Sequence, residues 1–226
     1  MSMIRDKLFG SHDIYKNFDF SEESVDMQGW ASDHPILPWA IEMLRPKLII
    51  EVGTWKGRSA INMAKKAMAL GLSCEILCID TWLGSPEHWL QDQWRDSLRM
   101  RNGRPDLYNT FLNNVISNKC QKYITPFPIT SEAAFFVLEK LNISSDLIYI
   151  DAGHEYESVA RDIRMYWSLL SESGLMILDD YIGYPGVTRA VNEFALEVGL
   201  YPVGEDGKAI LSKNKTLKIY PQIVFG

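Results

Sequence analysis

Short apolar runs alternate along most of this chain with segments in which apolar residues recur at helical spacing. The apolar runs cover residues 47–52, 75–80, 147–151 and 174–179. The segments with helical spacing cover residues 59–70, 107–116, 131–141, 156–170 and 186–198. Continuous apolar runs of this length are typical of central strands covered on both faces, and their alternation with helices predicts a parallel sheet.

Two weaker strand signals complete this pattern. A strand is expected around Tyr123–Pro126, where the prolines leave its limits undefined. Near the end of the sequence, residues 201–204 and 208–211 flank Glu205-Asp206-Gly207, which is a hairpin signal. An α/β chain that finishes in an antiparallel hairpin differs from a simple dinucleotide-binding fold.

The length of 226 residues suits one large domain with a sizeable core. A hydrophobic content of 46% and a charged content of 23% are ordinary for a folded protein. We therefore expect a single domain over 1–226, in which residues 1–45 form an N-terminal helical extension and residues 83–106 form a cap-like insertion.

Charge and cysteine content exclude several classes of partner. The net charge is −6 and most basic residues are scattered, so no nucleic-acid partner is expected. No apolar run is long enough for a membrane span, and the first 20 residues have no apolar signal segment, which predicts a cytoplasmic protein without a membrane partner. Three cysteines without metal-ligand spacing predict buried free thiols.

The first apolar run ends near Glu51 and leads into a loop with two glycines, Gly53 and Gly57. Glycine at a strand end permits a tight turn and a close approach of a ligand to the backbone. Thr54 and Ser59 belong to the same segment. The spacing differs from the glycine patterns of pyrophosphate and nucleotide-phosphate loops. The segment therefore predicts either another kind of cofactor loop or an ordinary turn.

A second acidic residue, Asp80, ends the next predicted strand. A carboxylate at this position would accept hydrogen bonds from the two hydroxyls of a ribose, although a strand-end aspartate is also common in turns and helix caps. Thr81 follows it, and then Trp82, which would either stack on a base or pack in the core. Thr130 and Ser131 begin a predicted helix, where Ser131 has the alternative role of N-cap.

Acidic residues also end two later strands. Asp151 is followed by His154, and Asp179 and Asp180 end the next strand. Three carboxylates at one sheet edge offer hard oxygen ligands to a divalent cation such as Mg²⁺, and His154 could take a proton from an acceptor hydroxyl bound there. Successive strand residues point to opposite faces, so Asp179 and Asp180 need not reach one ion. A structural hydrogen bond is the alternative role for His154.

These segments together resemble the class I S-adenosylmethionine-dependent methyltransferases, and especially the small-molecule O-methyltransferases related to macrolide-sugar methyltransferases. The resemblance covers roughly residues 47–194 and rests on the glycine loop, the Asp-x-x-His motif at 151–154 and the acidic pair at 179–180. Ala152 stands where many relatives carry glycine. The resemblance implies a Rossmann-like, doubly wound seven-stranded sheet with an antiparallel last strand.

The resemblance also implies S-adenosylmethionine as cofactor. The cofactor-binding set is then Glu51, Gly53, Thr54, Gly57, Ser59, Asp80, Thr81, Trp82, Thr130, Ser131 and Asp151. In this set Asp80 takes the ribose, Gly53 and Gly57 line the methionine part, and Thr130 and Ser131 meet the adenine edge. The implied catalytic residues are His154 and Asp151, and the implied Mg²⁺ ligands are Asp151, Asp179 and Asp180.

The expected reaction is O-methylation of a small hydroxylated acceptor such as a sugar, assisted by a divalent metal. A metal-independent small-molecule methyltransferase and a non-catalytic S-adenosylmethionine-binding protein are the alternatives. Residues 83–106 are aromatic and cationic, and they either cap the acceptor pocket or form a surface helix or a contact in a homo-oligomer. Residues 27–30 are expected to fold over the cofactor, and residues 183–186 to form a second wall of the pocket.

Overall fold

Seven strands form one sheet in the computed structural model of the protein, which describes residues 3–19, 25–30, 32–205 and 207–214. The strands are β1 (Leu48–Val52), β2 (Glu75–Asp80), β3 (Ile124–Pro128), β4 (Ser145–Ile150), β5 (Leu170–Leu178), β6 (Val203–Glu205) and β7 (Lys208–Ser212). Their order in the sheet is β3-β2-β1-β4-β5-β7-β6. The first five strands are parallel, whereas β7 runs antiparallel to both β5 and β6. The predicted doubly wound sheet with a reversed last strand is confirmed.

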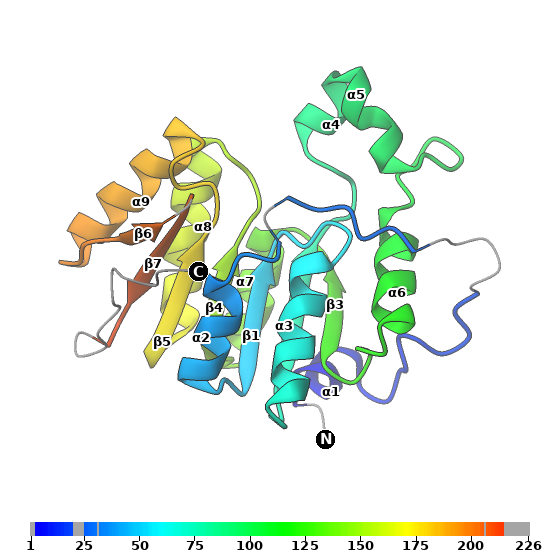
Figure 1. Cartoon of the computed structure of the whole chain (residues 1–226), viewed down its shortest axis with the longest axis horizontal. Helices are drawn as coiled ribbons and strands as arrows, with labels where there is room; N and C mark the ends of the chain where they lie inside the picture. The colour runs from blue at the N-terminus through cyan, green and yellow to red at the C-terminus, as the bar shows by residue number, and fades with distance from the viewer. Residues whose placement is uncertain (1–2, 20–24, 31, 206, 215–226) are drawn as a thin grey trace.

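Helices cover both faces of this sheet (Figure 1). Helices α2, α3 and α6 pack on one face, and α1, α7, α8 and α9 pack on the other. Their bounds are α1 (Met3–Phe9), α2 (Ile36–Leu44), α3 (Arg58–Ala69), α6 (Leu107–Ser117), α7 (Ser131–Lys140), α8 (Tyr156–Leu169) and α9 (Pro185–Glu197). Neighbouring strand residues such as Ile49 and Ile50 enter opposite cores because side chains alternate along a strand.

The weakly predicted strand and the hairpin are both present. Strand β3 contains Pro126 and Pro128, which are tolerated because β3 lies at the edge of the sheet. The hairpin pairs Val203 with Ile210 and Glu205 with Lys208, whereas Asp206 lies outside the described residues. Strand β5 begins at Leu170, directly after α8, and is therefore longer than the predicted run.

The carboxyl ends of the parallel strands meet at one edge of the sheet. From β1 the chain continues to β2 and β3 on one side of β1. It then crosses to β4 and β5 on the other side of β1, so the strand order reverses between β1 and β4. Ligands of open α/β sheets bind at such a switch point. Two short helices, α4 (Pro86–Leu90) and α5 (Asp92–Arg95), and the 3₁₀ turn η1 (Asp96–Leu98) follow β2, and α4 and α5 stand above this edge (Figure 1).

Two further sequence expectations concern burial. Cys74, Cys78 and Cys120 are buried free thiols, as predicted. Within the described residues, no helix combines the length and the apolar character needed to cross a membrane.

Candidate functional site

A cavity of about 550 Å³ opens at the carboxyl edge of the sheet. Its walls come from three groups of segments: the loops after the strands, the start of α7, and the segments that cross above the edge. The strand-end residues are Gly53, Thr54, Trp55, Asp80, Thr81, Asp151, Ala152, Gly153, His154, Asp179 and Asp180. The residues contributed from above are Gln28, Gly29, Trp30, Ser32, Gly84, Ser85, Pro86, Glu87, His88 and Trp94.

The glycine loop after β1 depends on Gly53. This residue has φ +83, and a Cβ added to it would lie 1.9 Å from the carbonyl oxygen of Asp151. Only glycine fits this conformation and this close approach between the ends of β1 and β4. Gly57 has φ +85, but its absent Cβ makes room for the ring of Phe111, and Gly57 does not line the cavity.

Asp80 holds the glycine loop in place through its carboxylate. One oxygen accepts hydrogen bonds from the backbone amides of Thr54 at 2.9 Å and Trp55 at 2.8 Å, and the other accepts from the amide of Trp82 at 2.7 Å. A carboxylate offers about four acceptor positions, so a fourth remains for a ligand hydroxyl. Asp80 therefore shapes the loop and also faces the cavity, but it has less free capacity than a bidentate ribose contact requires.

Glu51 lies beneath the loop and outside the cavity lining, which corrects its predicted role as a cofactor contact. Its fully buried carboxylate accepts hydrogen bonds from the hydroxyl of Thr54 at 3.1 Å and from the hydroxyl of Ser59. Burial raises the pKa of Glu51 to about 7. Glu51 thus fixes the loop from below, while Thr54 and Ser59 line the cavity.

The structure also corrects the role of Trp82. Its side chain is only 2% exposed, and its indole N–H donates a hydrogen bond of 2.7 Å to the carbonyl oxygen of Trp55. Its ring packs against Tyr108 and Phe111, with centroid distances of 4.9 and 4.8 Å. Trp82 is a core residue that supports the loop, and it is not available to stack on adenine.

A cluster of four rings lines the cavity instead. Trp55 stacks on His88 with a centroid distance of 4.3 Å, and Trp30 lies 5.9 Å from Trp55 and 5.3 Å from Trp94. The sequence pointed to the two segments that carry Trp30, His88 and Trp94, but Trp55 was missed. Its position two residues after Gly53, in a loop that has to approach a ligand, was the available signal.

Residues 25–30 cross the glycine loop as a strap. The buried ammonium of Lys56 forms an ion pair with Asp26 at 2.7 Å, and the indole N–H of Trp55 donates to Gln28 Oε1 at 2.8 Å. The side-chain amide of Asn114 accepts a hydrogen bond from the backbone N–H of Asp26 at 3.0 Å and donates one to its carbonyl oxygen at 2.7 Å. These contacts hold Trp30 and its neighbours at the cavity wall.

Thr130 and Ser131 both line the cavity, and the N-cap of α7 is Thr130 rather than Ser131. Thr130 is the N-cap of α7, because its hydroxyl accepts from the amide of Ala133 at 3.3 Å. Ser131 is the first helical residue and donates to the buried carboxylate of Asp162 at 2.9 Å. Burial raises the pKa of Asp162.

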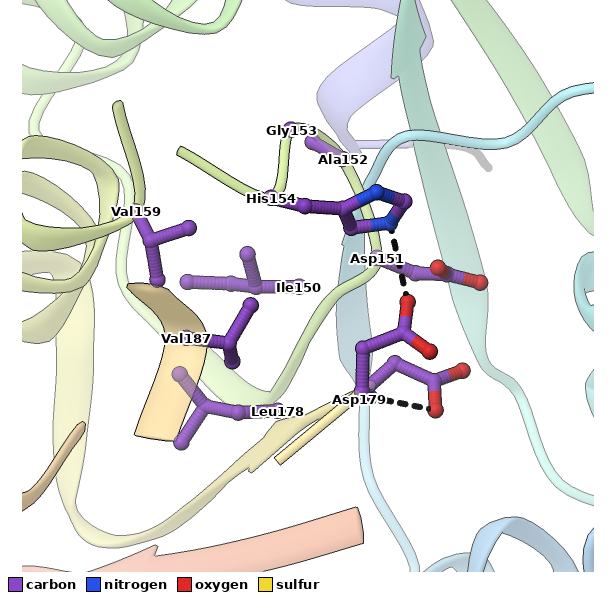
Figure 2. A pocket seen from close by; sticks show the side chains of 10 residues that line it. Ile150, Asp151, Ala152, Gly153, His154, Val159, Leu178, Asp179 and Val187 are labelled. Carbon is purple, nitrogen blue, oxygen red and sulfur yellow. Dashed lines mark hydrogen bonds and ion pairs between the residues drawn. The ribbon is translucent and has the colours of Figure 1, made fainter. Parts of the chain in front are cut away.

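The acidic residues at the ends of β4 and β5 lie on one side of a smaller hollow of this region, opposite Val159 and Val187 (Figure 2). The hydroxyl of Tyr149 lies 3.2 Å from Asp151 Oδ2 and also hydrogen-bonds Asp179. Lys208, fully buried on β7, forms an ion pair with Asp179. Burial and the neighbouring Asp179 raise the pKa of Asp151 well above its usual range, against the opposing effect of Lys208.

His154 is held by a different partner. Its Nε2 lies 3.0 Å from Asp180 Oδ2, and its ring stacks on Tyr184 with a centroid distance of 3.9 Å. Its Nδ1 faces Glu87 of α4 at 3.6 Å, which is too long for a good hydrogen bond. The hydrogen bond to Asp180 raises the pKa of His154 to about 8. Asp180 therefore favours the tautomer with the proton on Nε2 and leaves Nδ1 as the proton acceptor.

The predicted convergence of Asp151, Asp179 and Asp180 on one cation is not what the geometry shows. The carboxylate of Asp179 contacts Lys208 and the hydroxyl of Tyr149, whereas the carboxylate of Asp180 contacts His154. In the part of the chain that the structure describes, no group of three or more His, Cys, Asp or Glu side chains is arranged to hold a metal ion. The two neighbouring acids, expected to act together, serve separate partners because their side chains point in different directions.

Comparison with known protein families matches residues 50–181, more than half of the chain, to a family described as "methyltransferase domain". An uncharacterized protein (R132) of Acanthamoeba polyphaga mimivirus is 26% identical over 176 residues, which are 76% of this chain and 67% of that protein. The uncharacterized protein y4gI of Sinorhizobium fredii is 24% identical over 152 residues. That match takes in 67% of this chain but spans only 15% of the relative.

Solved structures of methyltransferases share the fold. The O-methyltransferase NovP superimposes with a TM-score of 0.59 at 17% identity, covering 80% of this chain and 79% of NovP. The calicheamicin methyltransferase CalS11 gives a TM-score of 0.57 at 18% identity, covering 80% and 77%. An O-methyltransferase from Bacillus cereus, solved with S-adenosylhomocysteine, gives 0.54 at 14% identity, covering 82% and 83%. The chain belongs to the methyltransferase domain family and is a class I S-adenosylmethionine-dependent methyltransferase.

Proposed function

We propose that this enzyme methylates a hydroxyl group of a small ring-shaped acceptor, with His154 as general base. The observation that carries the proposal is the pairing of His154 with Asp180 at the wall of the cavity that also contains the glycine loop. A histidine whose second nitrogen is held by a carboxylate is the arrangement used to deprotonate hydroxyl nucleophiles. The O-methyltransferase NovP, which shares the fold, supports the same chemistry.

The cofactor would lie along the ends of β1 and β2. Gly53 allows it to approach the loop backbone, Asp80 offers an acceptor to a ribose hydroxyl, and Thr130 and Ser131 stand where the adenine edge would be. When bound, S-adenosylmethionine supplies an electrophilic methyl group for an in-line displacement. Such a displacement is governed mainly by proximity and orientation, which the walls of the cavity provide.

The acceptor would occupy the part of the cavity between the ring cluster and His154. Trp30, Trp55 and Trp94 present flat apolar faces, and Glu87 adds an acceptor for hydroxyl groups beside His154. Rings with polar edges, including sugars, fit such a mixed surface. His154 would take the hydroxyl proton at Nδ1 while Asp180 stabilises the resulting positive charge.

The proposed chemistry has a metal-assisted and a metal-independent form. The ion pair between Lys208 and Asp179 favours the metal-independent form, because an ammonium group already neutralises the carboxylate that a cation would need. Turnover of an identified acceptor after exhaustive chelation would support this form. Activity that disappears on chelation and returns with Mg²⁺ would establish the other.

Calorimetric titration with S-adenosylmethionine and S-adenosylhomocysteine tests the cofactor site. Replacing Asp80 with alanine removes a charge-assisted contact and the acceptor that orders three loop amides. We expect the Kd to rise about 10- to 100-fold, as the loss of one such hydrogen bond implies. The exposed Asp92, which forms a surface ion pair with Arg95, provides the matched control Asp92→Ala. Equal affinity of Asp80→Ala and the wild type would refute the assignment.

The pH profile tests the base. Because general-base catalysis requires neutral His154, kcat/KM should rise with pH and level off above a midpoint near 8, the raised pKa of this residue. Asp180→Asn removes the anionic partner, so the pKa of His154 should fall and the midpoint should move toward the ordinary value near 6.5. Rates with an acceptor found by screening ring-shaped alcohols would be measured from pH 5.5 to 9.5. An unchanged midpoint in Asp180→Asn would show that another group is the base.

A further inference from the structure

Lys208 is an unusual residue for the core of a sheet. Its side chain is 0% exposed, and its ammonium contacts Asp179 and lies 3.1 Å from the hydroxyl of Tyr149. Lysine is almost never fully buried unless an opposite charge pairs with it. The carboxylate of Asp179 is that charge, so the two residues form a buried ion pair at the wall of the cavity.

The antiparallel pairing of β5 and β7 places Lys208 there. Ala209 pairs with Leu178, so Lys208 comes beside Asp179, the first residue after β5. The ammonium of Lys208 lies over the ring of Tyr149, with Nζ 5.3 Å from the ring centroid. The register of β7 against β5 therefore places the positive charge at the end of β5.

Tyr149 connects this ion pair to Asp151. Its hydroxyl contacts both Asp179 and Asp151 Oδ2, and Asp151 lines the cavity. A tyrosine hydroxyl has one proton to donate and can also accept the hydrogen bond from Lys208. The four residues form one continuous network in which a single ammonium faces two neighbouring carboxyl groups.

We propose that Lys208 is a built-in cation that positions Asp151 and Asp179 and takes the role that a divalent ion would otherwise fill at this edge of the sheet. Lys208 is a positioning residue: it acts on Asp151 through Asp179 and Tyr149. The claim that Lys208 positions Asp151 for turnover rests on the proposed function, whereas the claim that Lys208 excludes a divalent ion rests on the network alone. An experiment can therefore contradict one claim without contradicting the other.

Two differences distinguish this arrangement from an ordinary metal site. Asp179 directs its charge toward the buried ammonium, and Asp180 directs its charge toward His154. A divalent ion would have to displace the ammonium of Lys208 from a fully buried position. Removing the ammonium should leave two close carboxyl groups uncompensated, which is a condition that favours cation binding.

Titration with Mn²⁺ tests the proposal without any methyl transfer. Binding is measured as the decrease in the electron paramagnetic resonance signal of free Mn²⁺. The folded wild-type protein should show no Mn²⁺ binding that depends on Asp179. Lys208→Met, which keeps the apolar stem, should bind Mn²⁺ at least about tenfold more tightly than the wild type. Adding Asp179→Asn to Lys208→Met should abolish the gain.

Lys213→Met is the matched control, since Lys213 directly follows the other end of β7 and pairs with the exposed Glu172. It should bind Mn²⁺ no better than the wild type. Wild-type Mn²⁺ binding that Asp179→Asn removes would overturn the proposal, and this measurement stands even where Lys208→Met does not fold. A folded Lys208→Met variant without the gain would also overturn it. Neither result depends on whether the acceptor or the base has been assigned correctly.

Discussion

Gly53→Ala is expected to abolish cofactor binding and to destabilise the fold by about 4 kcal/mol or more, which is the range of severe core clashes. The new Cβ would lie 1.9 Å from the carbonyl oxygen of Asp151 and 2.8 Å from the Cα of Ala152. Both are backbone atoms, so rotation of a side chain cannot relieve the overlap. The ends of β1 and β4 would have to separate, and the cavity floor would move with them.

Gly71→Ala separates this clash from the general cost of a left-handed alanine. Gly71 has φ +62, and an added Cβ there meets no atom within 4 Å. Its substitution should cost only about 1–2 kcal/mol and leave cofactor affinity unchanged. Thermal unfolding and calorimetric titration of the two variants give the comparison. Wild-type cofactor affinity in a folded Gly53→Ala protein would contradict the proposed place of the glycine loop.

Local sequence pattern predicted the strands, the helices and the final hairpin, and the resemblance to the class I methyltransferases supplied their arrangement in one doubly wound sheet. The central runs at 75–80 and 147–151 became strands because each is apolar on both faces, and the sheet buries both faces under helices. The hairpin was predictable because its turn residues separate two short apolar stretches. The start of β5 at Leu170 was not predictable, since its first part includes exposed polar residues that lack an apolar pattern.

The positions of strand-end residues were also predictable, but the directions of their side chains were not. Asp80, Asp151 and His154 reach the cavity because parallel strands end at one edge. Trp82 is buried in the core, whereas Trp55, for which no role was predicted, lines the cavity, and both have a positive φ of 52. No periodicity in a loop encodes that angle.

Long-range partners were the other missing information. Asp179 was expected to share a ligand with Asp180, yet its partner is Lys208, 29 residues along the chain on another strand. The register of β7 against β5 decides this contact, and a hairpin signal alone does not fix that register. Glu51 likewise has a partner that was not predicted: its side chain points into the core, where it accepts a hydrogen bond from the hydroxyl of Thr54 in the glycine loop.

His154→Ala is expected to lower kcat by about 10²- to 10⁴-fold, the usual contribution of a general base. The imidazole lies at the cavity wall with Nε2 held by Asp180 and its ring stacked on Tyr184, so its loss removes the proton acceptor without opening the core. Cofactor affinity should stay within about threefold of the wild type, because His154 belongs to the acceptor side of the cavity.

His12→Ala provides the control, since His12 is exposed and lies outside the cavity lining. Single-turnover measurements with saturating cofactor would separate the methyl-transfer step from binding and release. The rate of His154→Ala should also lose the rise with a midpoint near 8, because the group that titrates there is gone. A variant that kept both the wild-type rate and the wild-type pH profile would show that His154 only positions Tyr184 and Asp180, and Glu87, on the other side of the ring, would then be the next base to test.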